Sequence, residues 1–440
     1  MPGSQPTGRT AMLLTMCGET PAGPTRMLSE LATDLQRKGI HHSTTPFVLS
    51  DTRDADKIRI EEETFAPLIN AGRIQYRRRT ENTGRKPGNI ADWLRSHGDC
   101  FDYMMTLDAD SRMGASRIAN MVARMERSPQ TGLLQAGMRL IPAKSRFGKL
   151  QRLSSRLMGP TFLKGFALWT GDAGNYWGHN ALIRIKAFRE AGHLPKLSGQ
   201  APFGGDILSH DFVEAALMRR AGWKIEIDAD THASAEDGPQ TLNEFHKRDR
   251  RWCQGNLQHS RLITAPRLHP ISRLHMAVGI MGYVAGPIWL ALVVLLSAGA
   301  VPIATFWPML AVATLLLMPK LCGLLRNLRA TRSPRARKIM LRAAGAELMM
   351  SSLIAPIVMI RDVLAVSSVV TGHDCGWKNP VAQQLSLPSG MLEALAGAAL
   401  VALVAAMNPV ALPFVLPVAG PLLAAPLLVP YLDYQKDIQT

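Results

Sequence analysis

An uncharged stretch beyond the middle of the chain restricts most strongly what this sequence can fold into. Residues 276–301, MAVGIMGYVAGPIWLALVVLLSAGAV, contain no Asp, Glu, Lys or Arg over 26 positions. About 20 consecutive apolar residues are enough for a helix to cross a bilayer. We therefore expect a membrane-spanning helix here. Residues 1–264, in contrast, carry mixed charges as a soluble domain does.

Three more apolar segments accompany the first one. Residues 303–325 are interrupted only by one Lys near their end, and residues 391–407 and 410–429 are also apolar, the last with four prolines. These lengths are typical of membrane spans or of the arms of a helical hairpin. We therefore expect a membrane region over residues 265–440 with about four transmembrane helices.

A further apolar segment, residues 346–372, leaves two alternatives open. It holds a Pro and an Arg-Asp pair in its middle, and charged side chains at that depth are costly. An interfacial or re-entrant helix fits this pattern as well as a span does. A loop expected over residues 326–342 is dense in Arg and Lys, which is typical of cytoplasmic segments. One span leading outward and one returning then place residues 1–264 in the cytoplasm.

The net charge of the chain indicates what kind of partner it binds. The 440 residues include 50 Lys and Arg but 34 Asp and Glu, a net charge of +16. An anionic partner is expected, and the apolar segments favour phospholipid headgroups or a phosphorylated substrate over nucleic acid. Five scattered cysteines show neither metal-site spacing nor a disulfide framework, as is usual in a reducing compartment. The first apolar run, AMLLTM, is too short for a signal peptide or a span.

Short apolar runs alternate with helical patterns within residues 1–264. Strands are expected at 11–16, 45–51, 73–79 and in the run that ends at Asp108, with helices at 26–39, 56–71 and 89–97. This alternation predicts an α/β domain with a mostly parallel sheet covered by helices on both faces. Ligands of such sheets bind at the carboxyl ends of the strands. Asp51, Asp108 and Asp110 all fall at such ends.

Asp108 and Asp110 lie two residues apart in the stretch YMMTLDADSRM. Two carboxylates this close repel each other unless a positive charge lies beside them. Their oxygens suit Mg²⁺ or Mn²⁺, which also binds diphosphates. An isolated D-x-D is more often a pair of exposed loop carboxylates, so its significance depends on the neighbouring segments.

Two of these segments allow both a structural and a functional interpretation. In ILSHDFVEAALMRRAGW (207–223), Asp211 is expected in the first turn of a helix. The helix dipole stabilises a carboxylate there, but such a group can also act as a general base. In TGRKPGN (83–89), Lys86 precedes an expected helix, either as part of a basic surface loop or as a contact for an anion.

The segment KRDRRWCQGN (247–256) precedes the first expected span. It is either a juxtamembrane basic patch for anionic lipid or a binding surface for substrate. In the second case Trp252 offers a flat surface for a sugar ring, beside guanidinium groups that suit a diphosphate.

In this order and ahead of a membrane region, these segments resemble family-2 glycosyltransferases. YWGHNALIR (176–184), together with residues 207–223 and 247–256, is similar to the glucosyltransferases of bacterial osmoregulated periplasmic glucan synthesis. The resemblance implies a nucleotide-diphospho-sugar transferase domain at residues 1–264, UDP-glucose as donor, a Mg²⁺ or Mn²⁺ ion and a β-1,2-glucan product. It also implies an inner-membrane location.

The resemblance assigns a role to each matching residue. It implies Asp211 as the catalytic base, Asp51, Lys86, Asp108, Arg248 and Arg251 as nucleotide-sugar contacts, Asp110 as the metal ligand, and Trp252, His179 and Asn180 at the acceptor. The implied partners are UDP-glucose, a glucan acceptor, membrane lipid and a periplasmic or membrane protein that handles the glucan.

Three alternatives stay open. One is another processive β-glycan synthase, similar to cellulose or chitin synthases. Another is a membrane scaffold with a degenerate catalytic domain, which would bind no UDP. The third follows from TLDADS, which also resembles the nucleophile strand of haloacid-dehalogenase-like phosphatases, although two strands are expected before it here.

Overall fold

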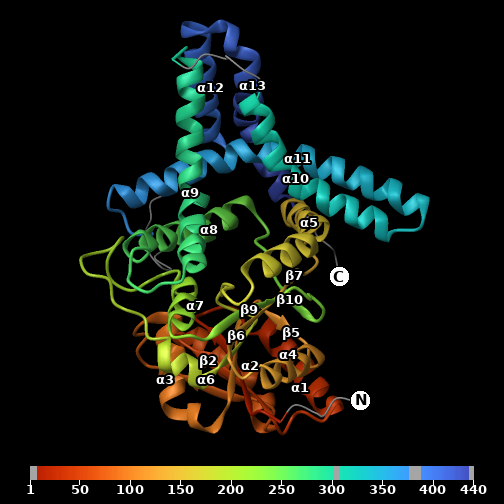
Figure 1. The fold of residues 1–440 in the computed structure, drawn as a ribbon, viewed down its shortest axis with the longest axis vertical. Helices are drawn as coiled ribbons and strands as arrows, with labels where there is room; N and C mark the ends of the chain where they lie inside the picture. The colour runs from red at the N-terminus through yellow and green to blue at the C-terminus, as the bar shows by residue number, and fades with distance from the viewer. Residues whose placement is uncertain (1–6, 301–306, 376–387, 436–440) are drawn as a thin grey trace.

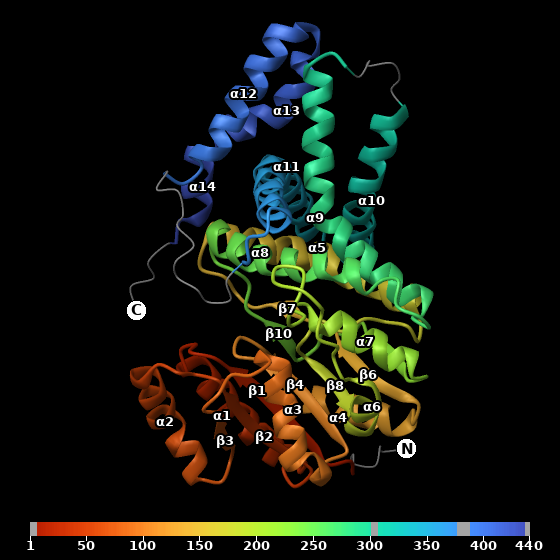
Figure 2. The same ribbon diagram turned by 90° about the vertical axis from the view of Figure 1, so that its left-hand side faces the viewer.

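The structure is a computed structural model that describes residues 7–300, 307–375 and 388–435. A lower part built around a β-sheet carries an upper part made of helices (Figure 1). The two parts are joined through two long helices, α5 (Arg146–Thr170) and α8 (Leu242–Gln258), which lie between the sheet and the upper helices (Figure 2).

The main sheet has seven strands. From one edge to the other they are β3 (Gln75–Arg78), β2 (Thr44–Ser50), β1 (Thr10–Met16), β4 (Tyr103–Asp108), β8 (Ala181–Arg184), β6 (Thr131–Ala136) and β9 (Lys224–Asp228). β8 runs antiparallel to β4 and β6, whereas the other strand pairs described in this sheet are parallel. The predicted mostly parallel sheet is therefore confirmed.

Helices cover both faces of this sheet. One face carries α1 (Ala22–Lys38), α2 (Ala55–Asn70) and α4 (Ala115–Arg127), and the other carries α3 (Arg85–His97), α6 (Ile185–Ala191) and α7 (His210–Arg220). The strands are apolar on both sides because successive side chains point to opposite faces. Thus Met12 and Leu14 of β1 pack under the first group of helices, and Ala11 and Leu13 pack under the second.

A second, three-stranded sheet follows the carboxyl end of β4. It consists of β5 (Arg112–Met113), β10 (Ser234–Glu236) and β7 (Arg139–Leu140). The backbone N–H of Gly114 donates to the carbonyl of Ala233 at 2.8 Å. This pairing holds the turn after Asp108 against a strand from far along the chain.

The upper part consists of six α-helices in the described residues. They are α9 (Pro270–Ser297), α10 (Trp307–Ala330), α11 (Pro334–Val370), α12 (Met391–Met407), α13 (Leu412–Leu423) and α14 (Ala425–Asp433). Short 3₁₀ turns occur at Gly98–Cys100, His259–Arg261 and Pro409–Ala411.

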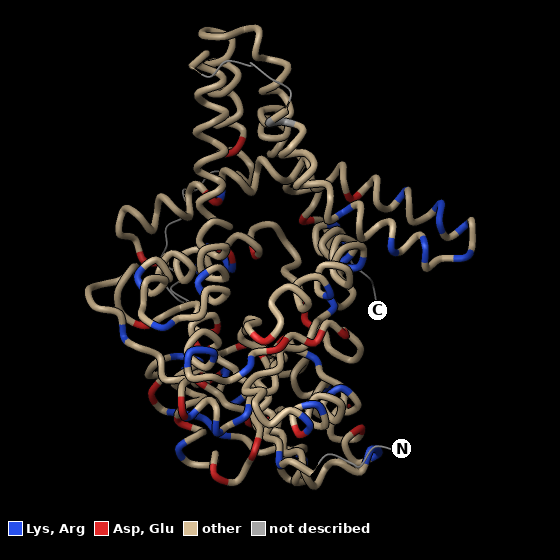
Figure 3. The backbone as a smooth tube through the Cα atoms, in the orientation of Figure 1, with Lys and Arg blue, Asp and Glu red and all other residues tan. Residues whose placement is uncertain are grey.

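Several of these helices have the length and composition of membrane spans. Three qualify, namely Pro270–Ser297, Leu310–Ala330 and Pro334–Val370, and a fourth is added if Pro409–Leu423 and Ala425–Asp433, bent by 53°, count as one. Charged residues are sparse in this part compared with the sheet domain below (Figure 3). The helices are therefore compatible with the expected membrane region. Residues 301 and 303–306 of the two predicted spans lie outside the described residues.

The loop predicted at residues 326–342 is wrong. Helix α10 continues to Ala330 and α11 begins at Pro334. Ser333 caps α11 by accepting a hydrogen bond from the Ala336 N–H, and Pro suits the first helical position. The basic residues therefore lie on two adjacent helices that project sideways (Figures 1 and 3).

Helix α11 includes the ambiguous segment 346–372 up to Val370 and runs crosswise to α9 (Figure 1). In Figure 2 it is seen nearly end-on, whereas α9 stands upright. A methyl group on Gly286 of α9 would lie 2.9 Å from Cβ of Asp362, so the two helices cross in close contact. This direction fits the interfacial alternative, provided that α9 crosses the membrane.

The core of the upper part extends into the two joining helices. Phe147 of α5 and Leu242 of α8 belong to the same buried cluster as Val293, Ile354 and Val404. Packing is therefore continuous across residue 264, and the division into residues 1–264 and 265–440 stays a prediction.

Trp93 offers a test of the lower core. Its side chain is fully buried, and its ring lies 5.2 Å from that of Phe47 in an edge-to-face arrangement. Replacing it in Trp93→Ala should lower the free energy of unfolding by about 3–5 kcal/mol, because contacts are lost and a cavity remains. Thermal unfolding of the purified chain in detergent measures this loss. Leu168→Ala is the control, since Leu168 is 85% exposed; equal melting temperatures for the two variants would contradict the packing.

Candidate active site

Asp51 lies where β2 ends, at the carboxyl edge of the sheet. Its backbone N–H donates to the carbonyl of Met16 at 2.8 Å, which joins it to the end of β1. Arg79 donates from Nε and Nη2 to the two carboxylate oxygens at 2.7 and 2.8 Å. The carboxylate is only 4% exposed. A carboxylate offers about four lone-pair positions, so a nucleotide contact would have to share these oxygens with Arg79.

Lys86 connects two segments that are far apart in the sequence. Its Nζ donates to Oδ1 of Asp108 and, at 2.8 Å, to the carbonyl of Gly178. Lys86 lies within the first turn of α3 rather than ahead of the helix as predicted, because α3 already begins at Arg85. Gly84 precedes the helix in a left-handed conformation, with φ of +68°. A side chain at Gly88 would collide with the carbonyl of Thr83, at 2.0 Å from its Cβ.

Asp108 and Asp110 differ in their electrostatic environment. Burial opposes the ionisation of Asp108, but the Lys86 ammonium, together with His179 and His210, holds the pKa of Asp108 below its usual range. The surrounding protein and the Asp108 carboxylate raise the pKa of Asp110 to about 6, although the Asp110 side chain reaches solvent. Asp108 is therefore paired with a cation, whereas Asp110 forms no ion pair with Lys or Arg within the described residues.

Asp211 lies in the first turn of α7, as predicted. It packs against Gly178, since a methyl group there would lie 3.5 Å from Oδ2 of Asp211. Burial raises the pKa of Asp211, with the nearby His210 opposing and Glu214 reinforcing the shift. Gly178 thus contacts both Lys86 and Asp211, and Lys86 joins it to Asp108.

His179 follows directly and lies beside the D-x-D turn. Its Nδ1 is 3.1 Å from Oγ of Ser111, and its Nε2 is 3.4 Å from Oε2 of Glu236. Glu236 also lies close enough to Asp110 to contribute to its raised pKa. His179 therefore lies in the candidate site, near the residue predicted to bind metal.

Asn180 does not fit its predicted place at the acceptor. The residue is fully buried, with φ of +49°, and its amide donates to Oγ of Ser234 at 3.0 Å. Its backbone N–H also donates to the carbonyl of Thr106 at 2.7 Å. Asn180 therefore joins β4 to the small sheet instead of facing a ligand. Its left-handed conformation, which Asn tolerates, is what the local structure requires.

Helix α8 carries the basic and aromatic residues predicted at the substrate. The Arg248 guanidinium lies over the Trp252 ring, 4.5 Å from its centroid, and Trp252 is 47% exposed. Burial lowers the pKa of Arg251, opposed by the nearby Cys375 and Glu19 side chains. Because Glu19 follows β1, Arg251 lies toward the carboxyl edge of the sheet. Arg248 and Trp252 form a half-exposed stacked pair on the same helix.

Two residues of the site were missed by sequence reasoning. Arg79 binds Asp51, and its position follows from the parallel pairing of β2 with β3, which places the residues after Ser50 and Arg78 together. Glu236 is brought beside His179 by the small sheet, whose strands are too short to stand out in the sequence.

The donor atoms at Asp108 and Asp110 suit a divalent metal. Within the described residues, no group of three His, Cys, Asp or Glu side chains is arranged to hold an ion by itself. Mg²⁺ is often held by one or two carboxylates together with substrate phosphates. The crowding that raises the pKa of Asp110 is relieved by a dication.

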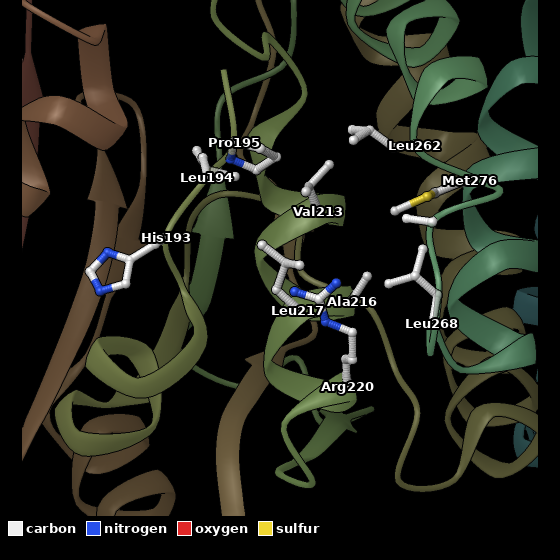
Figure 4. A pocket seen from close by; sticks show the side chains of 11 residues that line it. His193, Leu194, Pro195, Val213, Ala216, Leu217, Arg220, Leu262, Leu268 and Met276 are labelled. Carbon is white, nitrogen blue, oxygen red and sulfur yellow. The ribbon is translucent and has the colours of Figure 1, made fainter. Parts of the chain in front are cut away.

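An apolar cavity of about 240 Å³ lies on another side of α7 (Figure 4). Its lining includes Val213, Leu217 and Arg220 of α7 and Met276 of α9. At 100° per residue these α7 positions face away from Asp211. The cavity is therefore separate from the carboxylates described above.

Comparison with curated proteins finds close relatives. The chain is 40% identical over 415 residues to "Glucans biosynthesis glucosyltransferase H" of Vibrio cholerae serotype O1, covering 87% of this chain and 57% of the relative. It is 39% identical over 411 residues to the protein of the same name from Shewanella oneidensis, covering 86% and 56%. The chain thus spans somewhat more than half the length of these relatives.

Solved structures give a more distant likeness. A mannosyltransferase from Pyrobaculum calidifontis, in complex with GDP-Man and Mn²⁺, is 14% identical, with a TM-score of 0.48 over 84% of this chain and 89% of that one. A family model described as "Glycosyl transferase family group 2" matches residues 103–323, about half of the chain. The matched residues include the D-x-D, Asp211 and α8. Because the match covers the segment TLDADS, it favours the glycosyltransferase interpretation over the phosphatase alternative. The chain belongs to glycosyl transferase family group 2.

Proposed function

We propose that this chain is an inverting membrane glucosyltransferase that transfers glucose from UDP-glucose to a growing β-1,2-glucan. The arrangement of Lys86, Asp108 and Asp211 around Gly178 is the observation that carries this proposal. It places the Asp211 carboxylate, which can act as a base, close to the Lys86 ammonium, which can bind a diphosphate. The names of the relatives, glucans biosynthesis glucosyltransferase H, support the glucan product.

Asp211 acts as the general base in this proposal. Its raised pKa makes it a stronger proton acceptor than an ordinary Asp. It takes the proton of the acceptor hydroxyl as that oxygen attacks the anomeric carbon. Attack from the side opposite the UDP inverts the configuration.

The departing diphosphate requires positive charge. Lys86 and Arg251 are the cations that approach the carboxyl edge of the sheet from α3 and α8. Fixed cations and donors aimed at developing charge contribute strongly to catalysis because they need no reorganisation. Asp51 and Asp108 contact the nucleotide part, and the stacked Arg248 and Trp252 support the sugar and acceptor side.

A Mg²⁺ or Mn²⁺ ion fits on Asp110, beside Asp108 and the diphosphate. When bound, it supplies Lewis acidity and neutralises charge on the leaving group. His179 and Glu236 lie close enough to orient this part of the site. Ser111 holds the turn, because its Oγ accepts a hydrogen bond from the Asp108 N–H at 3.1 Å.

The proposed location is the bacterial inner membrane, with residues 1–264 as a cytoplasmic catalytic domain and 265–440 as the membrane region. Helices of suitable length and composition support this arrangement. The exposed basic residues around the α10–α11 turn would lie at the cytoplasmic surface, where they favour anionic lipid. With α9 crossing the bilayer, α11 would lie along its surface. A periplasmic or membrane partner would receive the glucan.

The donor sugar is tested by incubating membranes that contain the chain with labelled UDP-sugars. We expect incorporation from UDP-glucose into a polymer whose linkage analysis gives β-1,2 bonds. Preferential incorporation from UDP-N-acetylglucosamine, or a β-1,4 product, would favour a chitin- or cellulose-like synthase instead. Absence of both transfer and UDP binding would favour the scaffold alternative.

Asp211→Asn tests the proposed base. The amide keeps the shape of the side chain but cannot accept the proton, so kcat should fall by about 10²- to 10⁴-fold. In the unmodified chain, activity should decline as the pH falls through the raised pKa of Asp211, because the protonated carboxyl is no base. Both effects are measured as glucosyl transfer from labelled UDP-glucose.

Asp206→Asn is the matched control for this test, since Asp206 is an exposed carboxylate shortly before α7. It should retain transfer, and both variants should bind UDP. Normal turnover by Asp211→Asn would remove the base from this mechanism.

Asp110→Asn tests the metal site. Loss of a metal ligand should lower turnover by about 10²-fold and weaken the dependence of UDP binding on Mn²⁺. Calorimetric titration of UDP with and without Mn²⁺ measures the second effect. Asp102→Asn, at the opposite end of β4, is the control and should keep the full Mn²⁺ dependence. Equal Mn²⁺ dependence in both variants would place the metal elsewhere.

A further inference from the structure

Helix α8 is joined to the crosswise helix α11 by a pair of carboxyl groups. The carboxyl groups of Asp249 on α8 and Asp362 on α11 lie within hydrogen-bonding reach of each other. Tyr283 of α9 donates from its hydroxyl to Oδ1 of Asp249 at 3.1 Å. Asp249 precedes Arg251 and Trp252 by two and three residues, so the same turn of α8 carries this contact and the proposed substrate contacts.

A direct hydrogen bond between two carboxyl groups requires one proton. Two ionised carboxylates offer only acceptors and repel each other. Helix α9 covers one side of Asp362, since a methyl group on Gly286 would lie 2.9 Å from its Cβ, and both carboxyl groups are half-buried. Burial raises the pKa of Asp249, although its hydrogen bonds and the Arg248 guanidinium oppose the shift. The geometry therefore favours the state in which the pair shares a single proton.

Charged and titratable side chains from α8, α9 and α11 surround the Asp249–Asp362 pair. On α8, Arg248 lies over Trp252, and Cys253 is fully buried near both carboxyl groups. On α9 the neighbour is Tyr283, whose hydroxyl donates to Asp249. On α11, Arg361 is directed to Glu393 of α12, with Nε to Oε1 at 2.7 Å.

A second contact joins the same two helices without sharing a proton. Arg250 donates from Nη2 to Oγ of Ser368 at 2.9 Å. Arg250 is therefore held by a neutral acceptor one helical turn or more beyond Asp362. The two contacts differ in one property, since only the Asp249–Asp362 pair changes its charge with pH.

We propose that Asp249 and Asp362 are positioning residues that hold α8 against α11 through one shared proton, and thereby hold Arg251 and Trp252 at the donor and acceptor. This inference rests on the proposed function of those two residues. As the pH rises, the pair loses its proton and the two carboxylates repel. Helix α8 then moves away from α11, and UDP binds more weakly.

The test measures the affinity of the purified 440-residue chain for UDP in the presence of Mn²⁺ by calorimetry, from mildly acidic to alkaline pH. The unmodified chain should lose about tenfold in affinity as the pair ionises, the value expected for a lost hydrogen bond to a charged group. In Asp362→Asn the amide donates to the Asp249 carboxylate at every pH, so this alkaline loss should disappear. The same alkaline loss in Asp362→Asn would overturn the proposal.

Ser368→Ala is the matched control. It removes the contact with Arg250 but leaves the shared proton, so affinity should fall at all pH values while the alkaline loss stays. A Ser368→Ala variant that abolishes the alkaline loss would show that the pair is not its source.

A second measurement separates this proposal from the proposed function. Spin labels are attached at Lys247→Cys on α8 and Ser367→Cys on α11, both exposed, after the exposed Cys100 and Cys322 are changed to Ser. The distance between the labels should increase at alkaline pH, but not when Asp362→Asn is added. A pH-dependent distance without UDP binding would refute the donor site alone, whereas an unchanged distance would refute the shared-proton contact.

Discussion

The candidate site depends on one ammonium group placed between two oxygen acceptors. Lys86 binds Asp108 at the end of β4 and the carbonyl of Gly178, and Asp211 of α7 packs against the same glycine. The positive charge of Lys86 partly offsets the repulsion between the closely spaced carboxylates of Asp108 and Asp110. It also joins elements from three distant parts of the chain. Without this charge, the carboxylates at this edge of the sheet would separate or take up protons.

The environment gives similar carboxylates different properties. Asp108 is held ionised by Lys86, Asp110 is crowded by Asp108, and Asp211 is affected mainly by burial. A pair of titratable groups whose pKa values are pushed apart is typical of sites in which each group has its own task. Under the proposed function, the ionised residue holds the nucleotide, the crowded one holds a cation and the buried one accepts a proton.

The sequence predicted those parts of the fold that depend on local pattern. Apolar periodicity predicts the strands, their mostly parallel arrangement, the D-x-D at a strand end and the helix that carries Asp211 in its first turn. Contacts between distant segments could not be predicted in this way. The binding of Arg79 to Asp51 requires the register of β2 and β3. The burial of Asn180 depends on two-residue strands that pair only in the folded chain.

The elements of the site are held by different parts of the molecule. Helices α3 and α7 pack on the sheet through the cluster that contains Trp93 and Met218. Helix α8 instead has its first residue, Leu242, in the core of the upper helices. The distance between Arg251 and Asp108 therefore depends on how the upper helices sit on the sheet domain. A change in the membrane part would alter the proposed contact of Arg251 with the leaving group before it alters the D-x-D, because Arg251 is carried by a helix that packs into the upper part.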